Sequence, residues 1–119
     1  MKRTACILAA LMMVTGFAFG QTTVKGDFSA GVNSEGWALA QGTGDRTHIE
    51  FITFDKAYGE APKVMVSLTG FDATPGKDGT VRVHVAAEKI TKVGCVIKIK
   101  AWGDSKVNGV WGSYMAFGK

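Results

Sequence analysis

A strict alternation of apolar and polar residues between positions 80 and 102 constrains the fold more than any other feature of the chain. A repeat of two residues is the period of a β-strand that buries one face, and here it occurs in two strands separated by a short polar turn. The apolar set predicts a core, and the opposite set places a guanidinium and an indole on an outward face. The inward set comprises Val81, Val83, Val85, Cys95, Ile97 and Ile99, and the outward set comprises Arg82, His84, Lys98, Lys100 and Trp102.

The rest of the chain after Gly20 repeats this pattern in short runs, with glycines and polar turns between them and few helix signals. Six or seven short strands with turns about every ten residues are typical of a small antiparallel β-sandwich. We expect a tight loop over 103–108 after Trp102. The expected strands cover 23–30, 36–39, 47–54, 63–71, 80–87, 95–102 and 109–118.

The first 20 residues have the pattern of a secretory signal. Lys2 and Arg3 precede an apolar run from Ala5 to Val14, and small residues around Gly20 suit a signal peptidase. The run is shorter than the roughly 18–20 apolar residues that a membrane span needs. We therefore expect residues 1–20 to be a signal peptide, residues 21–119 to be one domain, and the protein to be secreted, either extracellular or periplasmic, without membrane insertion.

Charge and cysteine content narrow the function further. Without Lys2 and Arg3, 12 of the 14 basic residues remain against 10 acidic ones. This balance gives no electrostatic case for nucleic acid unless the basic residues cluster. Cys95 alone would remain after cleavage, so no internal disulfide can form, and its inward phase favours a buried, inert thiol over a bridge between chains.

Catalytic motifs are lacking. The chain has no G-x-S-x-G, P-loop, H-E-x-x-H or C-x-x-C sequence. His48 and His84 stand on different predicted strands, and neither has an acidic or histidine neighbour at ligand spacing, so we expect hydrogen-bonded or solvated side chains. We expect no enzyme, no metal and no cofactor; hydrolysis that depended on either histidine would contradict this.

Binding is better supported. Arg82, Trp102 and the segment from Gly103 to Lys106 would meet if the two alternating strands share a sheet or face a neighbouring protomer. Sugars need directional donors and acceptors for their hydroxyls and an aromatic surface for their C–H face. The alternative is that Trp102 is ordinary packing at a strand end and Arg82 is a solvated charge.

The stretch from about Phe51 to Phe117 resembles the H-type lectin domain, known from snail agglutinin and the discoidins. No single piece is diagnostic, but their order and spacing extend over about two thirds of residues 21–119. The matching pieces include Gly36-Trp37, Ile52-Thr53-Phe54, Pro62-Lys63-Val64, Val81-Arg82-Val83, Ala101-Trp102, Asp104-Ser105-Lys106 and Tyr114-Met115-Ala116.

The resemblance implies a six-stranded antiparallel β-sandwich that forms a homotrimer or hexamer and binds galactose or N-acetylgalactosamine-type glycans in clefts between protomers. It implies that Arg82 and Trp102 contact the sugar and that Gly103 and Asp104 belong to the same binding site. It also implies that a short acidic loop of the neighbouring protomer completes the cleft. The counterpart of that loop here is Gly44-Asp45. The snail agglutinin has a histidine directly after the tryptophan, so Gly103 leaves the identity of the sugar open.

Two functions follow from these observations. The first is multivalent attachment to glycans as a secreted lectin. The second is an oligomerising or protein-binding module that keeps the fold and has lost the sugar cleft at Gly103.

Overall fold

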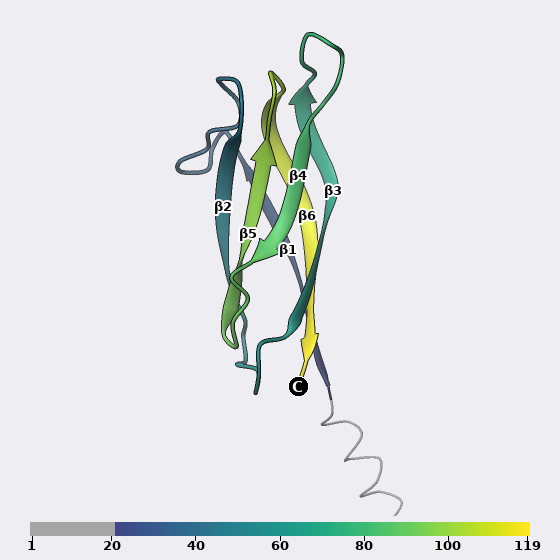
Figure 1. The fold of residues 1–119 in the computed structure, drawn as a ribbon. Coiled ribbons are helices and arrows are strands. Elements are labelled where there is room, and N and C mark those ends of the chain that lie inside the picture. The colour runs from purple at the N-terminus through teal and green to yellow at the C-terminus, as the bar shows by residue number, and fades with distance from the viewer. Residues whose placement is uncertain (1–20) are drawn as a thin grey trace, which may run out of the picture.

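The computed structural model describes residues 21–119, and these form two antiparallel sheets of three strands each (Figure 1). The expected six-stranded β-sandwich is confirmed, whereas the predicted signal peptide lies outside the described residues. No helix in this part of the chain is long and apolar enough to cross a membrane. The strands are β1 (Thr22–Gly31), β2 (Arg46–Thr53), β3 (Lys63–Thr74), β4 (Val83–Glu88), β5 (Gly94–Ala101) and β6 (Lys106–Gly118).

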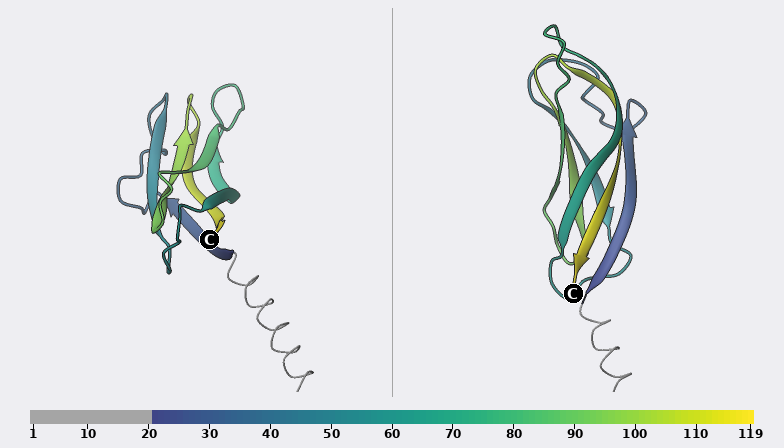
Figure 2. Two further views of the ribbon diagram at one scale, coloured as in Figure 1. Left: turned by 60° about the horizontal axis from the view of Figure 1, so that its bottom comes forward. Right: turned by 90° about the vertical axis from the view of Figure 1, so that its right-hand side faces the viewer.

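The order of strands in each sheet brings distant segments of the chain together. One sheet has the order β1-β6-β3 and the other the order β2-β5-β4, so β5 and β6 are the central strands. The two sheets face each other with their strands roughly along one axis (Figure 2). As a result, the start of β2, the end of β5 and the start of β4 all lie at the end of the molecule opposite the C-terminus.

The core lies between the two sheets and follows the alternation of the sequence. On β5, the predicted inward residues Cys95, Ile97 and Ile99 are all buried, and so is Ala101. Burial of apolar side chains from both sheets supplies the main driving force for this fold. Cys95 is a free thiol, and burial raises its pKa, as expected for an unreactive cysteine.

The segment from Gly36 to Leu39, expected as a short strand, is irregular. Gly36 has a φ of +76°, a left-handed conformation that ends extended backbone. The segment is instead held by individual hydrogen bonds to β6. The Trp37 indole N–H donates to the Val107 carbonyl at 2.9 Å, and the Val107 amide donates to the Leu39 carbonyl at 2.8 Å. Leu39 is fully buried, so this stretch packs onto the core without joining a sheet.

Two boundaries also differ from the prediction. The expected loop over 103–108 is shorter, because β6 already begins at Lys106. Arg82 precedes β4 instead of lying within it, because its amide donates to the Ser105 hydroxyl at 2.9 Å and not to a strand partner. Ser105, whose hydroxyl holds Arg82, is fully buried at the turn between β5 and β6.

Candidate functional site

The sheet β2-β5-β4 ends in a row of three residues that come from three different strands. Its last paired residues are Arg46 on β2, Ala101 on β5 and Val83 on β4. One residue farther along, the same register places Asp45, Trp102 and Arg82 in line. Ala101 is buried and points inward, so alternation predicts that Trp102 and Asp45 lie on the outward side; the Arg82 side chain, just before β4, is half-buried. The structure therefore brings Arg82 and Trp102 together at one end of one sheet.

Gly103 follows Trp102 at the point where the chain turns from β5 towards β6. Its φ of +67° is a conformation that side chains rarely adopt, which explains why glycine suits this position. A Cβ at position 103 would lie 3.4 Å from Arg82 Cδ. The lack of a side chain thus leaves the stem of Arg82 uncovered beside the turn.

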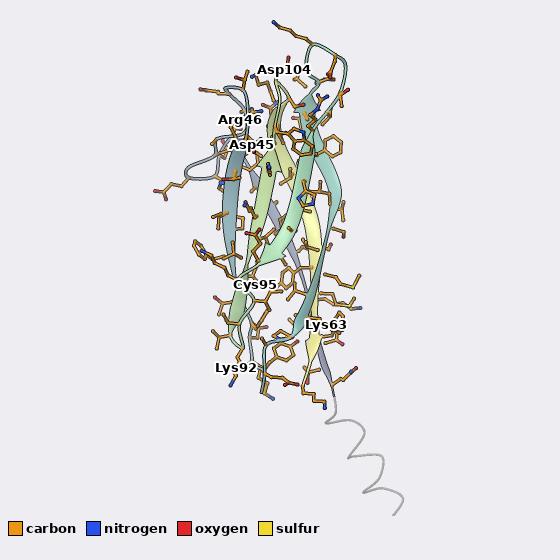
Figure 3. All side chains as sticks on the ribbon, in the orientation of Figure 1. Asp45, Arg46, Lys63, Lys92, Cys95 and Asp104 are labelled. Carbon is orange, nitrogen blue, oxygen red and sulfur yellow. The ribbon has the colours of Figure 1, made fainter. Side chains whose placement is uncertain are left out.

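The loop with Gly44 and Asp45 is bonded to this same turn within the chain. The Gly44 amide donates to the Gly103 carbonyl at 2.8 Å. Arg46 fixes the loop from inside, because its guanidinium donates to the Gly44 carbonyl at 2.9 Å and to the Gly103 carbonyl at 3.2 Å. In Figure 3, Asp45, Arg46 and Asp104 are all labelled at this end of the molecule. Gly44 and Asp45 therefore belong to the same cluster as Trp102 and Gly103.

Lys100 links the acidic loop to the indole. Its ammonium lies 3.2 Å from the Asp45 carboxylate and 6.0 Å from the centre of the Trp102 ring. A cation at this distance over an aromatic face adds a weak attraction. The prediction did not include Lys100 among the site residues, although its position two residues before Trp102 in the same strand already placed it on the same face.

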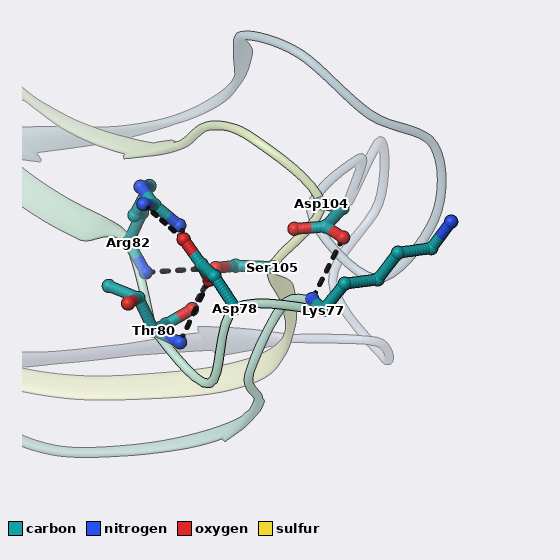
Figure 4. A network of polar contacts seen from close by, with 6 residues as sticks. All are labelled: Lys77, Asp78, Thr80, Arg82, Asp104 and Ser105. Atoms are coloured by element: carbon teal, nitrogen blue, oxygen red, sulfur yellow. Dashed lines mark hydrogen bonds and ion pairs between the residues drawn. The ribbon is translucent and has the colours of Figure 1, made fainter.

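Asp104 and Ser105 hold the loop between β3 and β4 against the site (Figure 4). One Asp104 carboxylate oxygen accepts from the Lys77 amide at 2.9 Å. The Ser105 hydroxyl accepts from the Arg82 amide and donates to the Thr80 carbonyl at 3.0 Å. Asp104, predicted as a site residue, thus anchors a neighbouring loop with its carboxylate.

Arg82 makes an ion pair with Asp78, a residue that the sequence reasoning did not single out. Nη2 of Arg82 lies 2.7 Å from Oδ2 of Asp78, and Nη1 lies 3.3 Å from Oδ1. The hydrogen bond from Arg82, together with the Thr80 amide, lowers the Asp78 pKa to about 2, and Asp78 raises the Arg82 pKa in turn. Spacing alone does not reveal this pair, because a glycine turn lies between the two residues.

The histidines lie apart from this cluster. His48 is buried on the inner face of β2, where its Nε2 lies 2.7 Å from the Glu50 carboxylate and its ring lies 5.0 Å from that of Trp37. The expectation that His48 has no acidic neighbour is therefore wrong, while its hydrogen-bonded state is confirmed. His84 is exposed on the outer face of β4. Within residues 21–119, no group of three or more histidine, cysteine or acidic side chains could hold a metal ion.

The site therefore offers recognition groups. Arg82 supplies a planar set of donors, Trp102 an apolar plate, and Asp45 a carboxylate acceptor, all on one face and within one row. A ligand with hydroxyl groups on its rim and an apolar side matches this set.

Known proteins with similar sequences show the family of the chain. The family model described as H-type lectin domain matches residues 49–117, more than half of the chain. A relative from Fuscovulum blasticum, the product of ATP synthase subunits region ORF 7, is 29% identical over 85 residues, which cover 71% of this chain and 72% of that protein.

Solved structures agree with the observed fold. Recombinant discoidin II of Dictyostelium discoideum has a TM-score of 0.74 at 24% identity, over 82% of this chain and 37% of that one. Wild-type discoidin II has a TM-score of 0.73 at 25% identity, over 82% of this chain and 36% of that one. A Pseudomonas phage phi297 tailspike shares the fold alone, with a TM-score of 0.54 at 13% identity over 84% of this chain and 16% of that one. The chain thus spans less than two fifths of discoidin II.

Proposed function

The chain belongs to the H-type lectin domain family, and from this premise we propose that it binds galactose or N-acetylgalactosamine units of glycans at the row formed by Asp45, Trp102 and Arg82. The observation that supports the proposal is the register of β2, β5 and β4, whose last paired residues Arg46, Ala101 and Val83 directly adjoin Asp45, Trp102 and Arg82 in the sequence. The indole would cover the C–H face of the sugar ring, the guanidinium would donate to ring hydroxyls, and the carboxylate would accept from them.

We further propose that the complete cleft forms between copies of the chain. β2 and β4 are the two edge strands of their sheet, so Asp45 and Arg82 stand on opposite edges of the row, on the order of 10 Å apart at two strand spacings. A cyclic assembly would bring the Asp45 edge of one copy to the Arg82 edge of the next. A homotrimer is the smallest ring that the resemblance implies, and its doubling would give a hexamer.

Exposed apolar side chains on the outer face of the same sheet support association there. Phe51 is 81% exposed and Ile49 is 45% exposed, and both lie in the outward phase of β2. Large apolar side chains gathered on one exposed face are typical of a surface that another protein covers. Several weak sites on one rigid assembly would then bind a glycan-covered surface together, because linked sites raise the effective concentration.

We also propose that the protein acts outside the cytoplasm. The proposal depends on the signal pattern of residues 1–20, with cleavage near Gly20. N-terminal sequencing of the protein recovered from the periplasm or medium of an expressing cell would check it. A mature N-terminus still carrying Met1 would contradict export by this route.

A second function is favoured by one observation at the site. Asp78 already occupies one end of the Arg82 guanidinium, and Gly103 adds no side chain that could touch a ligand. The fold could therefore act as an assembly or protein-binding module without sugar affinity. In that case galactose-type sugars would neither raise the melting temperature nor compete with the protein partner.

A glycan array with matched variants tests the proposed function. Wild type should bind galactose-terminated glycans, and Arg82→Ala and Trp102→Ala should lose at least about tenfold in affinity, or roughly 1.4 kcal/mol. Trp111→Ala is the matched control, because this tryptophan is half exposed but lies on the outer face of the other sheet. Absence of binding by wild type, or unchanged binding by both site variants, would overturn the proposal.

A further inference from the structure

The loop from Pro75 to Arg82 is built to hold one carboxylate against the guanidinium of the site. The Asp78 side chain meets both terminal nitrogens of Arg82, end-on, at 2.7 and 3.3 Å. The same carboxylate accepts from the Thr80 amide at 3.0 Å, so its position is set by the backbone as well as by Arg82 (Figure 4). Such a bidentate pair between a carboxylate and a guanidinium is the strongest geometry available to these groups.

The loop itself is braced from both sides. Within it, the Gly76 amide donates to the Thr80 carbonyl at 3.0 Å and the Gly79 amide donates to the Gly76 carbonyl at 2.9 Å. From outside, Asp104 accepts from the Lys77 amide and Ser105 bonds the Thr80 carbonyl. These four contacts fix the loop that carries Asp78. The Asp78 carboxylate therefore has a fixed position next to Arg82 and belongs to the site.

This arrangement decides which donors remain for a ligand. A guanidinium has five N–H groups, and Asp78 takes two of them at the end of the side chain. Of the three that remain, the Nε–H and one Nη2–H lie along one side edge of the guanidinium, and the third belongs to Nη1, which lies near Gly103 together with Cδ. Hydroxyl groups of a neutral sugar can accept from these without moving Asp78.

The charges around Arg82 also favour a neutral ligand over an anionic one. Asp78 and Asp104 both act on Arg82 and raise its pKa, so two carboxylates surround one guanidinium. The neighbouring ammonium groups have other partners: Lys100 lies by Asp45, and Lys106 donates to the Gly42 carbonyl. An anionic ligand at the end of the Arg82 side chain would meet the Asp78 carboxylate there, and like charges placed together across a binding site oppose association.

We propose that Asp78 makes the Arg82 site selective for neutral glycans and excludes acidic sugars such as uronates, sulfated sugars and sialic acids. An acidic sugar that uses the free donors brings a second negative charge beside the Asp78 carboxylate, whereas a neutral one brings none. The inference rests on the proposed function at Arg82, and it adds the residue that sets the charge class of the ligand.

The test compares galactose with galacturonic acid, two rings that differ in one carboxylate, by calorimetry on wild type, Asp78→Asn and Asp78→Ser. Both variants remove the charge and keep an oxygen that can accept from the Thr80 amide. Inorganic sulfate is the third probe, followed through the Arg82 Nε–H resonance. Asp55→Asn is the matched control, because it removes one exposed carboxylate just beyond the opposite end of β2.

Wild type should bind galacturonic acid at least about tenfold more weakly than galactose, as a carboxylate–carboxylate distance of about 4 Å implies. The Asp78 variants should gain about tenfold for galacturonic acid and for sulfate, with galactose affinity within about threefold of wild type; Asp55→Asn should behave as wild type. An unchanged ratio of neutral to acidic affinity together with unchanged sulfate binding would overturn the inference while leaving sugar binding intact. Conversely, if no protein binds galactose but sulfate reaches Arg82 only in the Asp78 variants, the lectin function fails and the role of Asp78 stands.

Discussion

The amide of Gly44 donates to the carbonyl of Gly103 at 2.8 Å and thereby joins the loop before β2 to the turn after β5. Neither residue contributes a side chain, so the contact is made entirely by backbone. It sets how far Asp45 stands from Trp102 and Arg82, and it does so inside a single chain. The backbone of a single chain therefore fixes the loop that carries Asp45, and the proposed assembly would only bring that loop to the Arg82 edge of a neighbouring copy.

Phe51 should control assembly. Phe51→Glu places a charge in the apolar part of the outer face of β2, where a covering copy would have to desolvate it, so the protein should shift from a trimer or hexamer to single chains. Native mass spectrometry and sedimentation check the mass. The matched control is Met65→Glu, at a methionine 64% exposed on the outer face of the other sheet. If the methionine variant dissociates the assembly and the phenylalanine variant does not, the interface lies on the opposite sheet.

Gly103→Ala should cost stability and binding together. Alanine at a φ of +67° costs about 1 kcal/mol in the free energy of unfolding, and its Cβ would press on Arg82 Cδ. We expect a three- to tenfold loss of galactose affinity, roughly 0.7–1.4 kcal/mol. Gly36→Ala is the control, since its φ is +76° and a Cβ there meets nothing within 4 Å. Urea unfolding should give both variants the same penalty, and calorimetry should show weaker binding for the first alone.

Ser105→Ala should destabilise the fold, although it removes only one oxygen atom. The substitution removes the acceptor of the Arg82 amide and the donor to the Thr80 carbonyl at a fully buried position. Leaving such groups without partners costs about 1–3 kcal/mol. Ser113, which is half-buried and bonds the Asp27 side chain at 2.9 Å, is the control, and its alanine variant should stay within about 0.5 kcal/mol of wild type. Equal urea midpoints for the two variants would contradict the role assigned to Ser105.

Asp78 should stay ionised to unusually low pH. Its pKa of about 2 lies below the ordinary 3.8, so its contribution to stability is present above pH 3.8 and is lost as the pH falls towards 2. Carboxyl NMR should give a midpoint near the lower value. In Arg82→Ala the midpoint should rise towards 3.8, because the largest cause of the shift is removed, while the Thr80 amide still holds it slightly down. A midpoint that does not move in this variant would show that Arg82 is not the cause.

The local sequence pattern was sufficient to predict which residues of the strands point into the core. The inward phase of Cys95, Ile97 and Ile99 is buried as predicted, and Trp102, expected at the end of the same strand, directly follows its last residue Ala101. The pattern misplaced the segment from Gly36 to Leu39, because alternation over four residues cannot show that Gly36 turns the chain out of an extended path.

The sequence by itself determined the alternation of faces, which depends on neighbours within a few residues. It also determined the membership of the H-type lectin family and the candidates Arg82 and Trp102, which depend on the order and spacing of motifs along the chain. Only the tertiary structure decided that Asp45 joins their row, that Lys100 links it to the indole and that Asp78 pairs with the guanidinium. These relationships depend on which strands are adjacent and on how separate loops bond to each other. Such choices are made when the chain closes into two sheets, and no local period records them.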